Sequence, residues 1–190
     1  MRRTSAAPSL GQRPPATREA IRSPVWLPPR AERTLIVVRR ARASPATSAG
    51  PSDPAGRAGY ANQPTSVALG DGLALSDLWI SAAVRCAPPD NKPTTEEFDR
   101  CEERWLRPEV ALLGQVRVVM ALGSLAWRVA WRVWGSGSRP AFGHGAEAPL
   151  HGGPAWLVGS YHVSQQNTFT GKLTEAMLDA VLARCRDLSG

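Results

Sequence analysis

The chain has 190 residues, 43% of them hydrophobic, which is the size and composition of one domain with a buried core. Its formal net charge is +7, its three Cys residues are too few for a disulfide scaffold, and Arg117, Arg128 and Arg132 interrupt the most apolar region. Secreted, membrane-spanning and fibrous proteins are therefore not expected, and no apolar run follows the first residues as in a secretory signal. The composition predicts a soluble, cytoplasmic domain.

The positive charge is concentrated in residues 1–57, which hold eleven Arg and three acidic residues, whereas residues 58–190 carry a net charge of −1. Ala, Arg, Pro, Ser and Gly supply 39 of the first 57 residues, a composition that buries little and favours disorder. One β-branched run within this segment, Thr34–Val38, predicts a buried strand. We expect a segment 1–57 that is disordered or foreign to the domain, followed by a folded domain over residues 58–190.

Strands and helices alternate through the folded part. Apolar runs predict strands at Leu78–Val84, Val116–Leu122 and Trp156–Ser160. The alternation predicts an α/β domain with a mainly parallel sheet, in which ligands bind beyond the carboxyl ends of the strands. Two polar loops leave strands at that edge, Arg85–Pro93 and Tyr161–Leu173, and we expect the site between them.

Three helices are predicted from their capping residues. Thr94 and Glu97 have the spacing of a capping box and begin a helix that we expect Pro108 to interrupt. Ser124 is predicted to cap the next helix and Thr174 the last one. The expected core faces are Leu125, Val129 and Val133 on the middle helix, and Met177, Leu178, Val181, Leu182 and Cys185 on the last.

Two groups of side chains are candidates for chemistry. Cys86 and Cys101 are separated by fourteen residues; two thiolates so placed can point at one metal cluster, or they can be ordinary buried side chains. His162 follows a strand and precedes a run of polar side chains, which suits recognition of a polar ring or stabilisation of a departing anion. The alternative is a capped loop whose amides satisfy backbone groups. His144 lies in a Gly-rich stretch that predicts a turn.

Taken together, these motifs resemble the type 5 branch of the uracil-DNA glycosylases from about Gly59 to the end of the chain. The matching residues are Arg85-Cys86-Ala87-Pro88-Pro89, Asn91-Lys92-Pro93, Cys101, Val118–Leu122 with Gly123, Gly159-Ser160-Tyr161-His162, Ser164, Gln166-Asn167 and Thr170–Thr174. The resemblance implies a three-layer α/β/α sandwich around a four-stranded, mainly parallel sheet, here with its N-terminal strand missing or distorted. It implies a monomeric DNA-repair hydrolase that cuts the N-glycosidic bond of uracil, and of other deaminated bases, in DNA, and that carries a [4Fe–4S] cluster.

The resemblance also implies a role for each matched residue. His162 corresponds to the catalytic residue that stabilises negative charge on the leaving uracil, and Asn91, in the proline-rich loop, is a second catalytic candidate. Cys86 and Cys101 correspond to the third and fourth cluster ligands. The DNA-binding loop that enters the duplex beside the extruded nucleotide corresponds to Ser164, Gln165, Gln166 and Asn167. This arrangement agrees with the chemistry, because a base inside the stack must be flipped out before it can be cut.

Three features depart from the family pattern. No Cys precedes Cys86, so two cluster ligands are missing, and Val163 stands where the family has Pro. Arg39–Pro45 follows the first predicted strand in place of a Gly-Leu-Ala-Pro-type motif. We therefore expect impaired activity and an N-terminal third that is not the family's own sequence. Two alternatives remain open at this point: a catalytically inactive protein that binds DNA lesions, and a frameshifted product without a DNA function.

Overall fold

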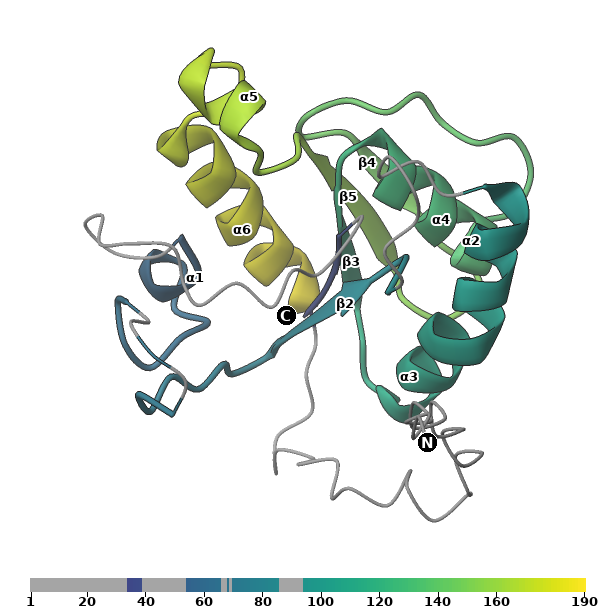
Figure 1. Cartoon of the computed structure of the whole chain (residues 1–190), viewed down its shortest axis with the longest axis horizontal. Helices are drawn as coiled ribbons and strands as arrows, with labels where there is room; N and C mark the ends of the chain where they lie inside the picture. Colours follow the sequence, from purple (N-terminus) through teal and green to yellow (C-terminus); the bar gives the residue numbers. More distant parts are fainter. Residues whose placement is uncertain (1–33, 39–53, 66–67, 69, 86–93) are drawn as a thin grey trace, which may run out of the picture.

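A five-stranded sheet runs through the part of the chain that the structure describes (Figure 1). The computed structural model describes residues 54–65, 68, 70–85 and 94–190, and the backbone of residues 34–38. The strand order is β2-β1-β3-β5-β4, in which the first four strands are parallel and β4 is an antiparallel edge strand. The strands are β1 (Thr34–Val38), β2 (Leu78–Ala82), β3 (Val118–Leu122), β4 (Glu147–Pro149) and β5 (Trp156–Ser160). The predicted α/β class is confirmed.

The N-terminal strand β1 lies in the centre of the sheet. Ile36 pairs with Ile80 of β2 on one side and with Met120 of β3 on the other, in regular parallel register. The strand predicted at Thr34–Val38 is thus confirmed and is neither missing nor distorted. This strand belongs to the segment 1–57, which we expected to lie outside the domain. The domain boundary at residue 57 stays a prediction.

Both faces of the sheet are covered by helices. Successive residues of β3 alternate between two core clusters: Val119 and Ala121 face helix α4 (Ser124–Trp134), and Val118 and Met120 face helix α6 (Glu175–Ser189). All five residues of β3 are buried, as expected for a parallel strand that is covered on both sides. The long apolar run that predicted this strand reflects that double burial.

The helices α2 (Thr95–Cys101) and α3 (Arg107–Leu112) are joined without a break by a π-helical turn, η3 (Glu102–Leu106). Thr94 and Glu97 form the predicted capping box at the start. The expected interruption at Pro108 is wrong. The π-helical turn shifts the hydrogen-bond register, with Arg107 N–H donating to Glu102 O, and Pro108 then falls in the first turn of α3, where a missing N–H is tolerated.

Helix α4 differs from its prediction at the start and on its core face. Its N-cap is Gly123, and Ser124 is the first residue of the helix. No side chain caps this helix start. Leu125 and Val133 are only partly buried, because the buried face of the helix lies one position further along and centres on Ala126, Val129 and Ala130. Its buried residues are Ala126, Trp127, Val129, Ala130 and Trp134.

Helix α6 begins as predicted, with Thr174 Oγ1 accepting from Met177 N–H. Of its expected core face, Val181, Leu182 and Cys185 are fully buried. The short helix α1 (Pro54–Arg57) lies against α6, where Arg57 makes two hydrogen bonds to the Asp179 carboxylate. No helix within the described ranges is long and apolar enough to cross a membrane.

Candidate functional site

The carboxyl ends of β3 and β5 meet at one edge of the sheet. Gly123 N–H, just beyond β3, donates to Ser160 O at the end of β5 over 2.8 Å. The backbone of Gly123 has φ 92° and ψ 164°, a conformation essentially restricted to glycine. A Cβ at this position would lie 3.4 Å from Cβ of His162, so the half-buried His162 packs directly on the bare glycine backbone. Two strand ends therefore fix the predicted catalytic residue.

The segment after His162 is a short helix, α5 (Gln165–Phe169), although we predicted a loop over Tyr161–Leu173. Ser164 caps it by accepting from Asn167 N–H, and Asn167 Nδ2 donates to His162 O over 2.8 Å. The missed signal was Ser164 itself, an N-cap residue three positions before Asn167. The alternative in which polar side chains satisfy backbone groups therefore holds for these two residues.

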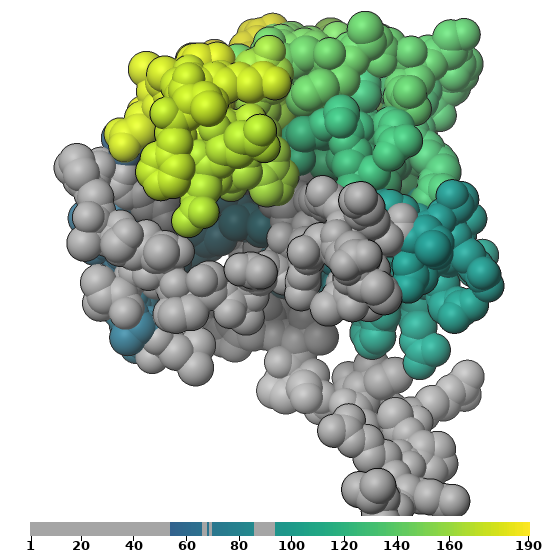
Figure 2. Space-filling model, turned by 45° about the horizontal axis from the view of Figure 1, so that its top comes forward, coloured from purple at the N-terminus to yellow at the C-terminus, as the bar shows by residue number. Residues whose placement is uncertain are grey.

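The other predicted DNA contacts, Gln165 and Gln166, are exposed on α5. Phe169, at the end of the same helix, is 84% exposed, although a large aromatic side chain normally buries much of its surface. Figure 2 shows the yellow-green residues of this segment at the surface. Sequence patterns did not single out Phe169, because an exposed and a buried phenylalanine look alike in a sequence.

A second histidine lies beside the site. His144 Nδ1 accepts from Tyr161 N–H over 3.2 Å, and the two rings are tilted against each other with centroids 5.1 Å apart. Since Nδ1 accepts, a neutral His144 carries its proton on Nε2, which is then a donor. Lys172 Nζ lies 5.0 Å from the centroid of the Tyr161 ring. The Gly-rich turn expected around His144 thus belongs to the wall of this site.

The second predicted loop begins from a fixed position. The carboxylate of Glu109 in α3 accepts hydrogen bonds from Trp79, Ser81 and Arg85 around the end of β2. The predicted residues Cys86 and Asn91 lie outside the described residues. In the sheet, β1 and β3 separate β2 from β5, so the two loops leave strands about 14 Å apart along the same edge.

The cysteines do not fit a four-thiolate cluster. The chain has three Cys in all, whereas a [4Fe–4S] cluster is held by four thiolates. Cys101 is buried at the end of α2, on the side of the sheet that α4 covers, but Cys185 is fully buried in the cluster on the opposite side. Burial raises the pKa of the Cys185 thiol to about 12, which disfavours a thiolate there. Within the ranges that the structure describes, no three His, Cys, Asp or Glu side chains form a group able to hold a metal ion.

The fold and the site define an α/β protein whose histidine is fixed where two neighbouring parallel strands end, next to a helix with exposed amides. Residues 52–186 match the family model described as the Uracil DNA glycosylase superfamily, and the chain belongs to this family.

Relatives support the same assignment. The Type-5 uracil-DNA glycosylase of Mycobacterium tuberculosis (strain CDC 1551 / Oshkosh) is 45% identical over 137 residues, covering 70% of this chain and 50% of the relative. The Type-5 uracil-DNA glycosylase of Thermus thermophilus is 47% identical over 134 residues, covering 70% of this chain and 60% of the relative. The protein of the same name from Mycobacterium leprae is 44% identical over 137 residues, covering 70% of this chain and 59% of the relative. The chain thus matches between half and three fifths of the length of these relatives.

Proposed function

We propose that this chain is a uracil-DNA glycosylase of the type 5 kind, which hydrolyses the N-glycosidic bond of uracil in DNA as a monomer. The single observation that carries the proposal is the placement of His162 against Gly123, where β3 and β5 end. Family membership supports the proposal. We further propose that the sheet and its helices form the three-layer α/β/α sandwich implied by the resemblance.

In the proposed mechanism, uracil leaves as an anion while the sugar gains oxocarbenium character. A hydrogen-bond donor that is already aimed at the developing negative charge lowers the barrier, because it requires no reorganisation during the reaction. We assign this donor to His162, whose main-chain carbonyl accepts from Ser164 N–H and Asn167 Nδ2. These two bonds hold the main chain at His162, and Gly123 leaves room for its side chain. We assign no step to an iron–sulfur cluster, because the thiol groups do not fit one.

The exposed end of the site is proposed to open the duplex. A base within the stack has to be extruded before His162 can reach it, and the space that it leaves has to be filled. Gln165 and Gln166 offer amides at the surface, and Phe169 offers an unpacked aromatic ring on the same short helix. Asn91 stays a proposed contact of the extruded base.

The test is single-turnover cleavage of a uracil-containing oligonucleotide, as duplex and as single strand. We expect His162→Ala to slow both substrates by about a hundred- to a thousand-fold, the usual effect of losing one such donor. Gln166→Ala should be slow on the duplex and should recover on the single strand, because an unpaired base needs less help to leave the stack. His151→Ala and Gln115→Ala are matched controls, since both side chains are exposed near the opposite edge of the sheet.

Two results would contradict the proposal. Equal rates of His162→Ala and the unmutated protein would leave His162 as a structural residue of the segment. Tight binding of uracil-containing DNA without cleavage would replace the enzyme by a protein that binds DNA lesions.

A further inference from the structure

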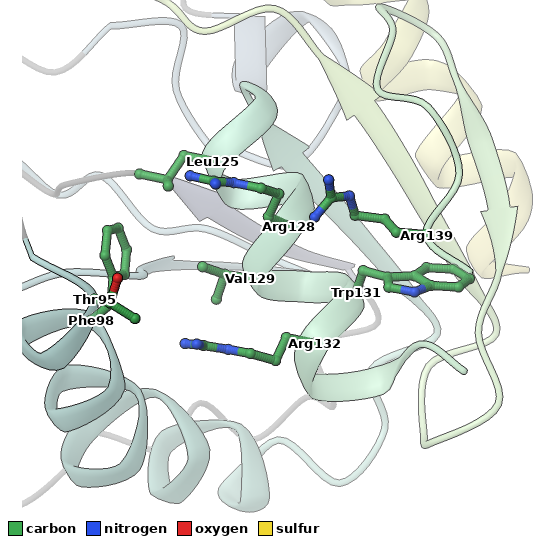
Figure 3. Close-up of a pocket in the computed structure, with 8 residues that line it drawn as sticks. All are labelled: Thr95, Phe98, Leu125, Arg128, Val129, Trp131, Arg132 and Arg139. Atoms are coloured by element: carbon green, nitrogen blue, oxygen red, sulfur yellow. The ribbon is translucent and has the colours of Figure 1, made fainter. Parts of the chain in front are cut away.

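A groove of about 290 Å³ lies between the start of α2 and helix α4, outside the site described above. Its floor is apolar, and three arginines line it (Figure 3). Thr95 and Phe98 come from α2, and the remaining residues come from α4 and the segment that follows it: Leu125, Arg128, Val129, Trp131, Arg132 and Arg139. Three guanidinium groups around one groove make it a candidate anion site, unless acidic side chains neutralise them.

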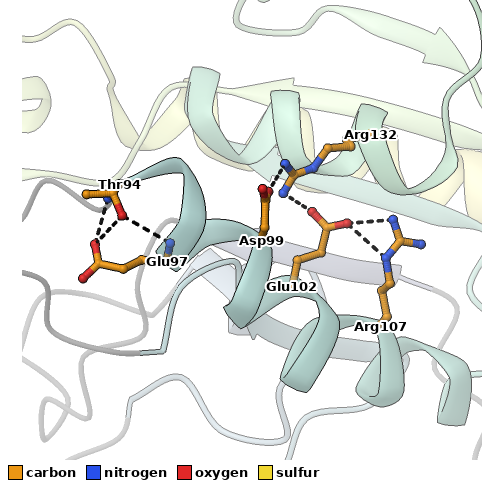
Figure 4. A network of polar contacts seen from close by, with 6 residues as sticks. All are labelled: Thr94, Glu97, Asp99, Glu102, Arg107 and Arg132. Carbon is orange, nitrogen blue, oxygen red and sulfur yellow. Dashed lines mark hydrogen bonds and ion pairs between the residues drawn. The ribbon is translucent and has the colours of Figure 1, made fainter.

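One of the three arginines is already neutralised. Arg132 reaches across to α2, where it pairs with Asp99 over 2.6 Å and with the buried Glu102, which also binds Arg107 (Figure 4). Burial lowers the pKa of Arg132, but the hydrogen bonds and charges of Glu102 and Asp99 outweigh it and raise the pKa above its usual value. The two negative charges of Asp99 and Glu102 neutralise the two positive charges of Arg107 and Arg132. Arg132 therefore does not add net positive charge to the groove.

Arg128 and Arg139 have no acidic partner within the described residues. Both are exposed, and together they give the groove two uncompensated positive charges. In contrast, Arg57, Arg100 and Arg184 each pair with a carboxylate. The groove therefore carries positive charge that no acidic side chain of the described residues neutralises.

The fold holds Arg139 in the groove by two hydrogen bonds that flank it. Trp131 Nε1 donates to Gly137 O over 3.4 Å, and Trp127 Nε1 donates to Pro140 O over 3.0 Å. The Trp131 ring also packs on Gly135, where a Cβ would lie 2.3 Å from the ring. Two indole rings on α4 therefore fold the chain back after the helix and bring Arg139 alongside it.

We propose that this groove binds a phosphodiester group of the DNA strand, with Arg128 and Arg139 as the phosphate ligands. The inference rests on the proposed function. Helix α4 starts at the glycine that touches His162, and Arg128 lies five residues further on, about 8 Å along the helix axis. That distance is about two nucleotide steps of a DNA strand. Arginine suits this ligand, because its planar fork matches two phosphate oxygens, and the apolar floor strengthens the attraction by lowering the local dielectric constant.

The test is the salt dependence of binding to a fluorescent DNA duplex, followed by anisotropy at several salt concentrations. Each phosphate contact contributes about 0.9 to the slope of log K against log salt. Because both arginines are proposed to hold the same phosphate, we expect the double variant Arg128→Gln/Arg139→Gln to lower the slope by about one, and each single variant to lower it by less. Arg117→Gln is the matched control, because this exposed arginine directly precedes β3, near the opposite edge of the sheet, and should not change the slope.

The outcomes separate this inference from the proposed function. If the unmutated protein binds DNA and the arginine variants keep its slope, the proposed phosphate site in the groove is wrong, but the proposed function stands. Unmutated protein that binds no DNA overturns both. Calorimetry with inorganic phosphate forms a further arm: if the arginine variants lose phosphate binding but keep the DNA slope, the groove takes a free anion and the inference is wrong.

Discussion

Substitution of Gly123 by alanine tests how the backbone positions His162. Gly123 ends β3, caps α4 and lies under the histidine side chain, so one methyl group affects three features. Its N–H donates to Ser160 O, which locks the end of β3 to the end of β5. An alanine must therefore either adopt the glycine conformation or break this link.

The expected cost follows from the backbone angles. With φ 92° and ψ 164°, an L-residue at this position is strained by about 1–3 kcal/mol. The new Cβ would stand 3.4 Å from Cβ of His162, which leaves the histidine little room to move toward the backbone. We expect Gly123→Ala to lower the free energy of unfolding by about 1–3 kcal/mol and to slow cleavage in the folded fraction as well.

Urea unfolding measures the first effect, and single-turnover cleavage at a temperature where the variant is fully folded measures the second. Gly114→Ala is the control: its φ is not positive, no atom lies within 4 Å of the added methyl group, and its stability should change by less than about 0.5 kcal/mol. If Gly123→Ala is as stable as Gly114→Ala, the backbone is not strained. If it is unstable but cleaves at the normal rate, the contact with His162 does not matter for the reaction.

Three further predictions concern the rest of the domain. Glu102→Gln should cost about 1.5 kcal/mol in urea unfolding, because a buried charged acceptor of Arg107 and Arg132 is lost, and a loss no larger than that of the exposed Glu103→Gln would contradict this. Because burial raises the pKa of Cys185 to about 12, above its unfolded value of about 8.5, the thiol stabilises the fold fully below pH 8.5 and loses this effect as the pH rises toward 12. Between pH 8 and pH 10, the urea midpoint of Cys185→Ala should therefore fall less than that of the unmutated protein. An equal fall in both proteins would show that the raised pKa of Cys185 does not contribute. Anaerobically purified protein should contain far fewer than four irons per chain, and iron and sulfide near four with a brown absorbance shoulder would overturn that expectation.

The sequence predicts β3 and β5 because buried strands are rich in apolar residues, and it predicts β1 from its β-branched run. Each of β1, β3 and β5 pairs with a strand on both sides, and all five residues of β3 are buried. β4 left no such signal, because it has three residues, includes Pro149 and pairs with β5 alone. A proline is tolerated there because an edge strand leaves some of its N–H positions unpaired.

The candidate site could be predicted only in part. His162 is visible because a histidine followed by several polar residues stands out after an apolar strand. His144 is not, because its place depends on how Gly143 meets Gly159: a Cβ on Gly159 would lie 2.5 Å from Gly143 O, so the turn fits onto β5 only against a glycine. Such an approach between residues sixteen positions apart along the chain depends on tertiary packing, which local patterns do not contain.

His162 is held by contacts from three elements of the described fold. Its main chain is held by Ser164 and Asn167, and its side chain rests on Gly123, all from β3, β5 and α5. Cys101 ends α2, and Asp99 of α2 and Glu102 just after it pair with Arg132 of α4. An ion-pair network thus joins α2 to α4 within the described residues. Iron analysis and cleavage assays on the same preparation measure cluster content and the role proposed for His162 separately.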